Sequence, residues 1–186
     1  DIGLMKMLPN MTVIVPCDYN QTKNATIAAA EYEGPVYLRF GRPKVPNFTP
    51  ADERFVIGKA QMLHEGKDVT IFACGHLVYK ALEAIPYLNE KGIHPEIINM
   101  HTIKPLDVEA VLQSVAKTRH VVTAEEHSVI GGLGSAVCDC LCAKLPTPVK
   151  KLGMQDVFGT SGPAAELVKK YGLDAEGVYK SVKEFI

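Results

Sequence analysis

The sequence predicts an α/β protein: a mostly parallel open sheet forms the C-terminal domain, and the partial end of a second α/β domain precedes it. Three observations lead to this prediction. Short β-branched apolar runs alternate with longer segments of helical periodicity, which is typical of layered α/β folds. Prolines concentrate between the two units, in a polar stretch around residues 43–50. A length of 186 residues is enough for one sizeable core and part of another.

The first unit, residues 1–42, contributes only two predicted strands. Apolar periodicity favours a short helix at residues 2–8, which Pro9 stops, and a buried strand at 12–15. An alanine-rich helix is expected at residues 20–32, and a second strand follows at 36–40. Because two strands and two helices do not complete a domain, we interpret this unit as the back end of a domain whose front precedes Asp1.

The rest of the chain divides into a linker and a second unit. Residues 43–68 are expected to form the linker, with room for a strand of its own. Residues 69–186 have the alternation of a complete open-sheet domain. The predicted strands of this domain are 69–74, 96–100, 120–124 and 149–152, and its predicted helices are 76–91, 108–117, 134–144, 163–171 and 175–185.

Composition and charge exclude several classes of function. The 20 basic and 21 acidic residues nearly cancel, and no basic run or Trp occurs, so nucleic acid is not an expected partner. The apolar runs are too short to cross a bilayer and no signal peptide is recognised, so we expect no membrane partner and a cytoplasmic location. Cys138, Cys140 and Cys142 cannot converge from one helix, so no metal site is expected.

A glycine-rich turn lies between the predicted strand 120–124 and the next helix, which is the order of a nucleotide-binding loop. The segment Gly132-x-Gly134-x-x-Val137 lacks the third glycine of a dinucleotide fingerprint, and no acidic residue follows about twenty positions later. Glu125 and Glu126 lie between the strand and the turn, where they would repel a phosphate. Phosphate binding at the helix N-terminus and close helix–strand packing both stay open for the Gly131–Gly134 loop.

Charged side chains and histidines follow several predicted strands, at the edge where parallel sheets bind ligands. His127, flanked by carboxylates, is a candidate anion or interface contact, with a backbone cap as the competing interpretation. Asp18 and Arg42 follow the two strands of the first unit, where they either pair with each other or face a substrate cleft. His76 and His101 share this edge, but their spacing matches no short metal-ligand pattern.

The chain resembles the transketolase family along its full length. Asp1-Ile-Gly-Leu-Met-Lys-Met-Leu-Pro-Asn-Met-Thr-Val-Ile-Val-Pro-Cys-Asp18 and Gly34-Pro-Val-Tyr-Leu-Arg-Phe-Gly-Arg42 are similar to the end of the pyrimidine-binding domain. Val122-Thr-Ala-Glu-Glu-His-Ser-Val-Ile-Gly-Gly-Leu-Gly-Ser-Ala-Val137 and Asp156-Val-Phe-Gly-Thr-Ser-Gly162 resemble the transketolase C-terminal domain. The likeness is greatest to the C-terminal subunit of split transketolases.

This resemblance implies a thiamine-diphosphate enzyme that moves a two-carbon ketol unit between sugar phosphates. It implies that thiamine diphosphate and Mg²⁺ bind in the intact enzyme, and that this chain alone binds neither and is inactive. The implied partners are an N-terminal transketolase section, a second copy of the chain and a sugar-phosphate substrate, and a dimer is expected. Asp18 would contact substrate hydroxyls and Arg42 the substrate phosphate. No residue of the chain is expected to be catalytic, and the glycine loop would serve as scaffold.

Other functions share this layout. Deoxyxylulose-phosphate synthases and E1β-type subunits of 2-oxo acid dehydrogenases are built from the same domains, and the residues that would separate them are expected before Asp1. A non-catalytic dimerisation module is the alternative from another class. Such a module would associate through its C-terminal domain and would bind no sugar phosphate.

Overall fold

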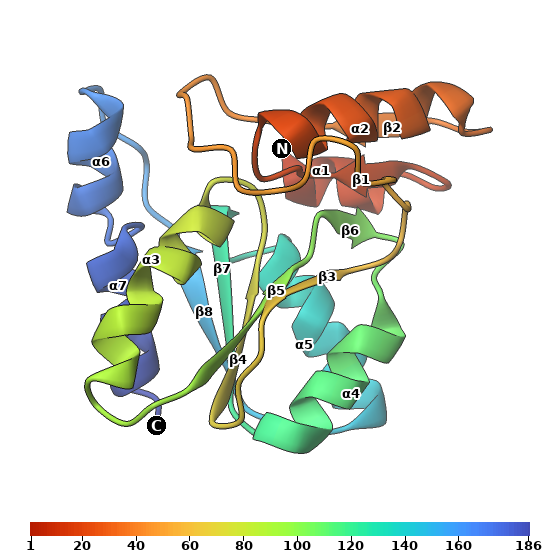
Figure 1. The fold of residues 1–186 in the computed structure, drawn as a ribbon. Helices are drawn as coiled ribbons and strands as arrows, with labels where there is room; N and C mark the ends of the chain where they lie inside the picture. Colours follow the sequence, from red (N-terminus) through yellow and green to blue (C-terminus); the bar gives the residue numbers. More distant parts are fainter.

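The structure, a computed structural model, describes all of residues 1–186 as two stacked α/β units (Figure 1). The smaller unit is built on a three-stranded sheet in the order β2-β1-β6. The larger unit is built on a five-stranded sheet in the order β3-β5-β4-β7-β8, in which only β3 runs antiparallel. The predicted fold class, a mostly parallel open sheet preceded by part of a second α/β unit, is confirmed.

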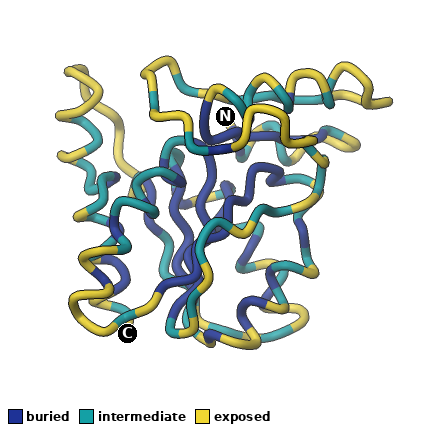
Figure 2. Tube along the Cα trace, in the orientation of Figure 1, coloured by how far each residue is buried: buried dark blue, intermediate teal, exposed yellow.

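The N-terminal unit has the predicted order of elements. β1 and β2 pair in parallel, with Thr12 opposite Val36. The second helix begins after Asp18, whose side chain accepts a hydrogen bond from the amide of Gln21. This helix buries few side chains and lies along the outer surface of the molecule (Figure 2). The elements are α1 (Ile2–Met7), β1 (Thr12–Ile14), α2 (Tyr19–Glu31) and β2 (Val36–Leu38).

A short strand that the sequence analysis did not predict completes the small sheet. β6 (Thr102–Lys104) follows β5 in the chain but pairs antiparallel with β1, with Val13 opposite Lys104. The ammonium group of Lys104 also donates to the backbone carbonyls of Lys6 and Leu8 at the end of α1. The second unit of the chain therefore supplies one edge of the sheet in the first.

The linker is irregular up to β3 (Gln61–His64), the strand for which the sequence left room. β3 pairs antiparallel with β5 and forms one edge of the large sheet. The predicted end of the third parallel strand at residue 124 is wrong, because β7 continues to Ser128 through Glu125, Glu126 and His127. The strands of the parallel sheet are β4 (Val69–Ala73), β5 (Pro95–Asn99), β7 (Val121–Ser128) and β8 (Val149–Met154).

Helices cover both faces of the large sheet (Figure 1). α3 (Leu77–Asn89) and α7 (Ala175–Lys183) pack on one face, with α6 (Ala164–Lys170) beside α7. α4 (Val108–Thr118) and α5 (Leu133–Lys144) pack on the other face. None of these helices combines the length and apolar character needed to span a membrane.

The central strands β4 and β5 are buried on both faces, which explains why most of their residues are apolar (Figure 2). In β4, Ile71 and Ala73 face the core under α3 and α7, whereas Phe72 faces the core under α4 and α5. The second core also contains Ile2 and Val13 of the N-terminal unit. The two units thus share a core, and the carboxyl ends of the parallel strands lie beneath the N-terminal unit (Figure 1).

Candidate substrate site

A cavity of about 530 Å³ opens at the carboxyl ends of the strands, between the two units. It is lined by Asp18 after β1, by Arg42 and Lys44 after β2, and by His76 at the start of α3. The structure thus brings the two predicted substrate-binding residues to the same cavity. Asp18 and Arg42 do not form an ion pair with each other. Because both line this cavity, the geometry is compatible with the interpretation that they face a substrate cleft.

Arg42 and Lys44 supply positive charge that no other part of the protein neutralises. Both residues are exposed at the wall of the cavity, and neither forms an ion pair with a carboxylate. A guanidinium presents several donors in a planar fork, and an ammonium is a compact point charge, so the two together suit a phosphate. This wall of the cavity can bind an anion.

Asp18 is engaged in a different way, because its carboxylate already accepts four hydrogen bonds. Oδ1 accepts from the Gln21 amide at 2.8 Å and from Thr49 Oγ1 at 2.7 Å. Oδ2 accepts from the amides of Phe48 and Thr49 at 2.9 and 2.8 Å. A carboxylate has about four acceptor positions, and Asp18 is only 3% exposed. Its contact with substrate hydroxyls stays a prediction, and this contact would require the Phe48–Thr49 segment to move.

His76 reaches the cavity from the second unit. Its Nδ1 lies 3.3 Å from Oε2 of Glu126 near the end of β7. The hydrogen bond with His76 lowers the pKa of Glu126, because it favours the carboxylate form. On its other edge the ring rests against Gly41, where an added Cβ would lie 2.6 Å from His76 Nε2. A side chain at this position, directly before Arg42, would require the His76 ring to move.

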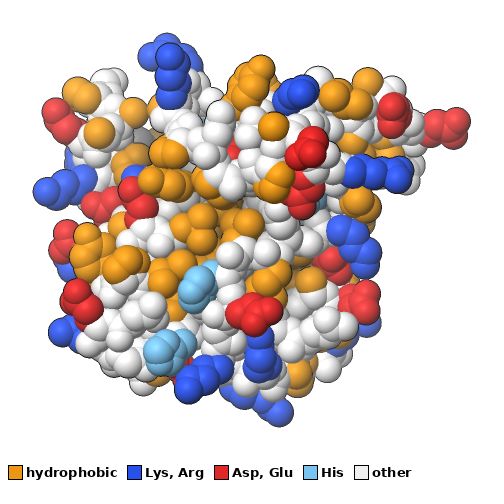
Figure 3. Space-filling model, in the orientation of Figure 1, with side chains coloured by type: hydrophobic (Ala, Val, Ile, Leu, Met, Phe, Trp, Pro, Cys, Tyr) orange, Lys and Arg blue, Asp and Glu red, His pale blue; other side chains and the backbone are white.

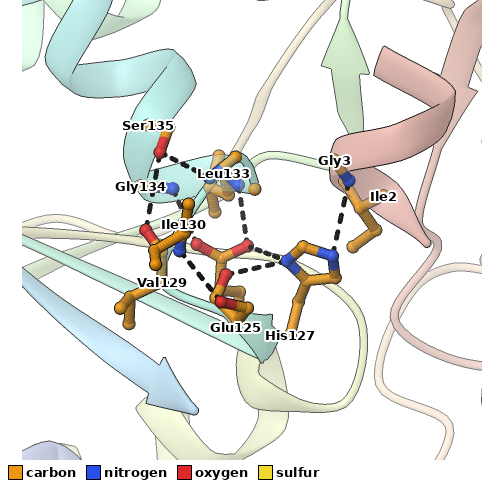
Figure 4. A network of polar contacts seen from close by, with 12 residues as sticks. Ile2, Gly3, Glu125, His127, Val129, Ile130, Leu133, Gly134 and Ser135 are labelled. Atoms are coloured by element: carbon orange, nitrogen blue, oxygen red, sulfur yellow. Dashed lines mark hydrogen bonds and ion pairs between the residues drawn. The ribbon is translucent and has the colours of Figure 1, made fainter. Parts of the chain in front are cut away.

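The glycine loop has a structural explanation (Figure 4). Glu125 is completely buried, and its two carboxylate oxygens accept hydrogen bonds from the amides of Leu133 and Gly134 at 2.7 and 2.8 Å. Burial raises the pKa of Glu125, and these amide hydrogen bonds oppose the rise. The amides at the start of α5 that a phosphate would need therefore already bind a carboxylate. This geometry favours the packing interpretation of the Gly131–Gly134 loop.

His127 lies between β7 and α1, beside Glu125 (Figure 4). Its Nδ1 is 3.8 Å from Glu125 Oε2 and 2.8 Å from the carbonyl of Ser128. Its Nε2 is 3.4 Å from the amide of Gly3 in α1. Burial lowers the pKa of His127, although its hydrogen bond to Ser128 acts in the opposite direction. The residue occupies an interface between the two units, whereas the predicted contact with an anion stays untested.

His101 does not line this cavity. It is 5% exposed, its ring packs on Phe55 with centroids 4.2 Å apart, and burial lowers its pKa to about 4. The histidines at the strand ends therefore do not converge. No position in the structure gathers three His, Cys, Asp or Glu side chains suited to a metal ion.

On the face seen in Figure 3, acidic and basic side chains are interspersed around an apolar and neutral centre. No broad basic surface is visible on this face that would attract a nucleic acid.

Two family models match the chain, one in each unit. The family model of the transketolase C-terminal domain matches residues 58–178, and that of the transketolase pyrimidine-binding domain matches residues 1–47. The chain belongs to the transketolase family. The family predicted from the quoted segments is confirmed.

The transketolase relatives of this chain are longer than the chain itself. It is 47% identical to a solved chain described as a split-gene transketolase, inactive β4 tetramer, with a TM-score of 0.93 over 99% of this chain and 60% of that one. It is 46% identical to a putative transketolase C-terminal section of Methanocaldococcus jannaschii, covering 58% of that protein. A 1-deoxy-D-xylulose-5-phosphate synthase of Chlorobium luteolum is 36% identical, and the chain covers 30% of it. This transketolase chain therefore spans a little over half the length of the split relatives.

Sequence reasoning about this transketolase site missed two contacts. It placed His76 at the correct edge of the sheet but did not predict its pairing with Glu126, because the two lie fifty positions apart in sequence. It also did not predict that Thr49 would satisfy Asp18, since Thr49 lies in an irregular linker with no periodic pattern. The glycine at position 41, between a strand and an arginine, was the signal available for a close contact at this place.

Proposed function

We propose that the protein is the C-terminal section of a split transketolase that uses thiamine diphosphate to transfer a two-carbon ketol unit between sugar phosphates. Membership of the family and the cationic cavity together support this proposal, and the unpaired guanidinium of Arg42 is the observation that carries it. Relatives described as parts of divided transketolases add to the support. One of them is part of an apulose-4-phosphate transketolase of Phocaeicola vulgatus, 41% identical over 187 residues and covered over 60% of its length.

In this proposal Arg42 binds the phosphate of the sugar substrate through two parallel N–H donors. Asp18 fixes the wall of the cavity by holding the Phe48–Thr49 segment in place. A direct contact between Asp18 and substrate hydroxyls requires this segment to rearrange when substrate binds. No proton transfer or covalent step is assigned to a side chain of this chain.

The proposal assigns thiamine diphosphate and Mg²⁺ to a site completed by an N-terminal transketolase section and by a second copy of this chain. The cofactor supplies the carbon–carbon chemistry when it is bound. A related chain is described as a β4 tetramer of a split-gene transketolase, and this description supports assembly of the present chain with other subunits. We further propose that the enzyme is cytoplasmic and that the 186-residue chain alone has no ketol-transfer activity.

The test is Arg42→Ala in the assembled enzyme, with ribose 5-phosphate and unphosphorylated ribose as acceptors. Loss of a charged hydrogen bond should cost about 1.5–3 kcal/mol of transition-state binding for the phosphorylated acceptor. Its kcat/KM should therefore fall roughly tenfold to a hundredfold. The unphosphorylated acceptor should be affected less than about twofold, since it makes no such bond. Arg54→Ala is the matched control, because Arg54 is also exposed but lies outside this cavity. Equal losses for both acceptors would mean that Arg42 is structural, and turnover by the isolated chain would contradict its proposed inactivity.

A deoxyxylulose-phosphate synthase is the second candidate, because several of these synthases are 33–38% identical over nearly the whole chain. The two reactions differ in one product. A synthase of this type consumes a 2-oxo acid and releases CO2, whereas ketol transfer between sugars releases none. Release of CO2 from pyruvate by the assembled enzyme would decide for the synthase.

A further inference from the structure

His76 is the one residue of the second unit that lines the cavity with the exposed cations. It lines the same cavity as Arg42 and Lys44, and its side chain is 19% exposed. Its ring touches the backbone of Gly41, which immediately precedes Arg42. The side of the ring that carries Nε2 therefore lies next to Gly41, the residue directly before Arg42.

Glu126 fixes the orientation of this ring. Nδ1 lies 3.3 Å from the carboxylate, so an imidazole that carries both protons donates from Nδ1 to Glu126 and keeps Nε2–H for a second acceptor. Arg39 holds Glu126 in turn, because its Nη2 donates to the Glu126 carbonyl at 2.9 Å.

The charges around His76 favour an anion at this second acceptor position. Arg42 and Lys44 face the cavity from the segment after β2, and Arg39 lies at the end of β2. The carboxylate of Glu126 lies against His76 Nδ1, and the carboxylate of Asp18 is enclosed by four hydrogen bonds. His76 also stands at the positive end of the 13-residue helix α3, with no capping hydrogen bond from its own side chain.

Resting on the proposed function, we propose that the C-terminal domain contributes to the phosphate site: His76, oriented by Glu126, binds the substrate phosphate together with Arg42. The ligand class is a phosphate monoester of a small sugar, because Arg42, Lys44 and His76 line one cavity and each can donate hydrogen bonds to a phosphate. His76 is a binding residue in this arrangement, and Glu126 is a positioning residue that acts through it. Gly41 is required because any side chain would displace the ring of His76.

The test follows the histidine ring protons of the 186-residue chain by NMR, with inorganic phosphate, ribose 5-phosphate and ribose as probes at constant ionic strength. The His76 signal is assigned by its loss in His76→Asn. We expect this signal to shift saturably with the two phosphates in the millimolar range and not with ribose. His76→Asn and Glu126→Gln should each weaken phosphate binding by about 3- to 10-fold, the scale of one hydrogen bond. His94→Asn, at an exposed position away from the cavity, should leave binding unchanged.

The outcomes separate this inference from the proposed function. If Arg42→Ala abolishes binding while the His76 signal does not move and His76→Asn binds normally, His76 is not part of the site and the role of Arg42 stands. If no probe produces a saturable shift, or no variant alters binding, the phosphate site itself is refuted. Should His76→Asn fail to fold, the shift of the wild-type signal and the effect of Glu126→Gln still decide the question.

Discussion

One buried histidine should make the stability of this protein depend on pH in a defined window. Burial lowers the pKa of His101 from 6.5 to about 4, while the carboxylate of Asp107 opposes the change. The neutral ring packs on Phe55, and its Nδ1 lies 3.0 Å from Thr102 Oγ1. Because the folded state binds the proton less readily than the unfolded chain, the stabilisation is complete above pH 6.5 and is lost as the pH falls toward 4.

The magnitude follows from the two pKa values. Their difference corresponds to about 3 kcal/mol of unfolding free energy when the linkage is complete. About 2 kcal/mol of this should be lost between neutral pH and pH 5, where the unfolded chain is mostly protonated at this histidine and the folded protein is not.

His101→Asn removes the titrating group, and urea denaturation between about pH 7.5 and pH 5 measures its effect. The wild-type protein should be the more stable at the higher pH, since it keeps the ring contact with Phe55. This difference in unfolding free energy should shrink by about 2 kcal/mol at the lower pH. His94→Asn controls for the loss of a histidine at an exposed position. Stability curves of wild type and His101→Asn that stay parallel over this range would refute the reasoning.

Three further predictions concern residues described above. Asp18→Ala should lower the unfolding free energy by about 3 kcal/mol in urea denaturation, because it removes a helix cap and three other buried hydrogen bonds; the same loss from exposed Asp52→Ala would contradict this. Gly132→Ala should lower Tm by several degrees, since its Cβ would lie 2.7 Å from Glu125 Cδ, whereas Gly159→Ala has no atom within 4 Å and should be neutral. Under native conditions a maleimide should modify exposed Cys142 first, while the two buried cysteines should react only after unfolding, and their early modification would argue against their burial.

Much of the large sheet could be predicted because its strands have a strong local signal. Val69–Ala73 is buried on both faces, so it is mostly apolar and rich in β-branched residues. β6 escaped prediction for the opposite reason. Thr102–Lys104 is a strand of three residues, and its only partner, β1, lies far away in the sequence. Such a strand is specified by tertiary pairing, which leaves no periodic pattern.

The end of β7 shows how buried polar groups mislead local reasoning. Glu125 and His127 are polar residues of the kind found in loops, yet they belong to a strand. Glu125 tolerates burial because α5 supplies two amide donors, and His127 is accommodated because Gly3 and Ser128 lie beside it. Apart from Ser128, these partners come from two other segments, α5 and α1, so only the folded structure reveals them.

The common edge of the sheet at which Asp18 and Arg42 lie could be predicted better than the contacts that they make there. Arg42 and Asp18 were placed from the rule that ligands collect at the carboxyl ends of parallel strands, and both do line one cavity. The engagement of Asp18 by Phe48 and Thr49 could not be inferred, because backbone amides in an irregular segment have no sequence signature.

The pairing of β1 with β6 has a consequence for synthesis on the ribosome. Ile14 emerges before its partner Thr102, which is 88 residues further along the chain. At about 5–20 residues per second, the apolar strand waits on the order of ten seconds with one edge open. During this interval it is a natural client for a chaperone, and slowing translation between residues 14 and 102 should prolong that association.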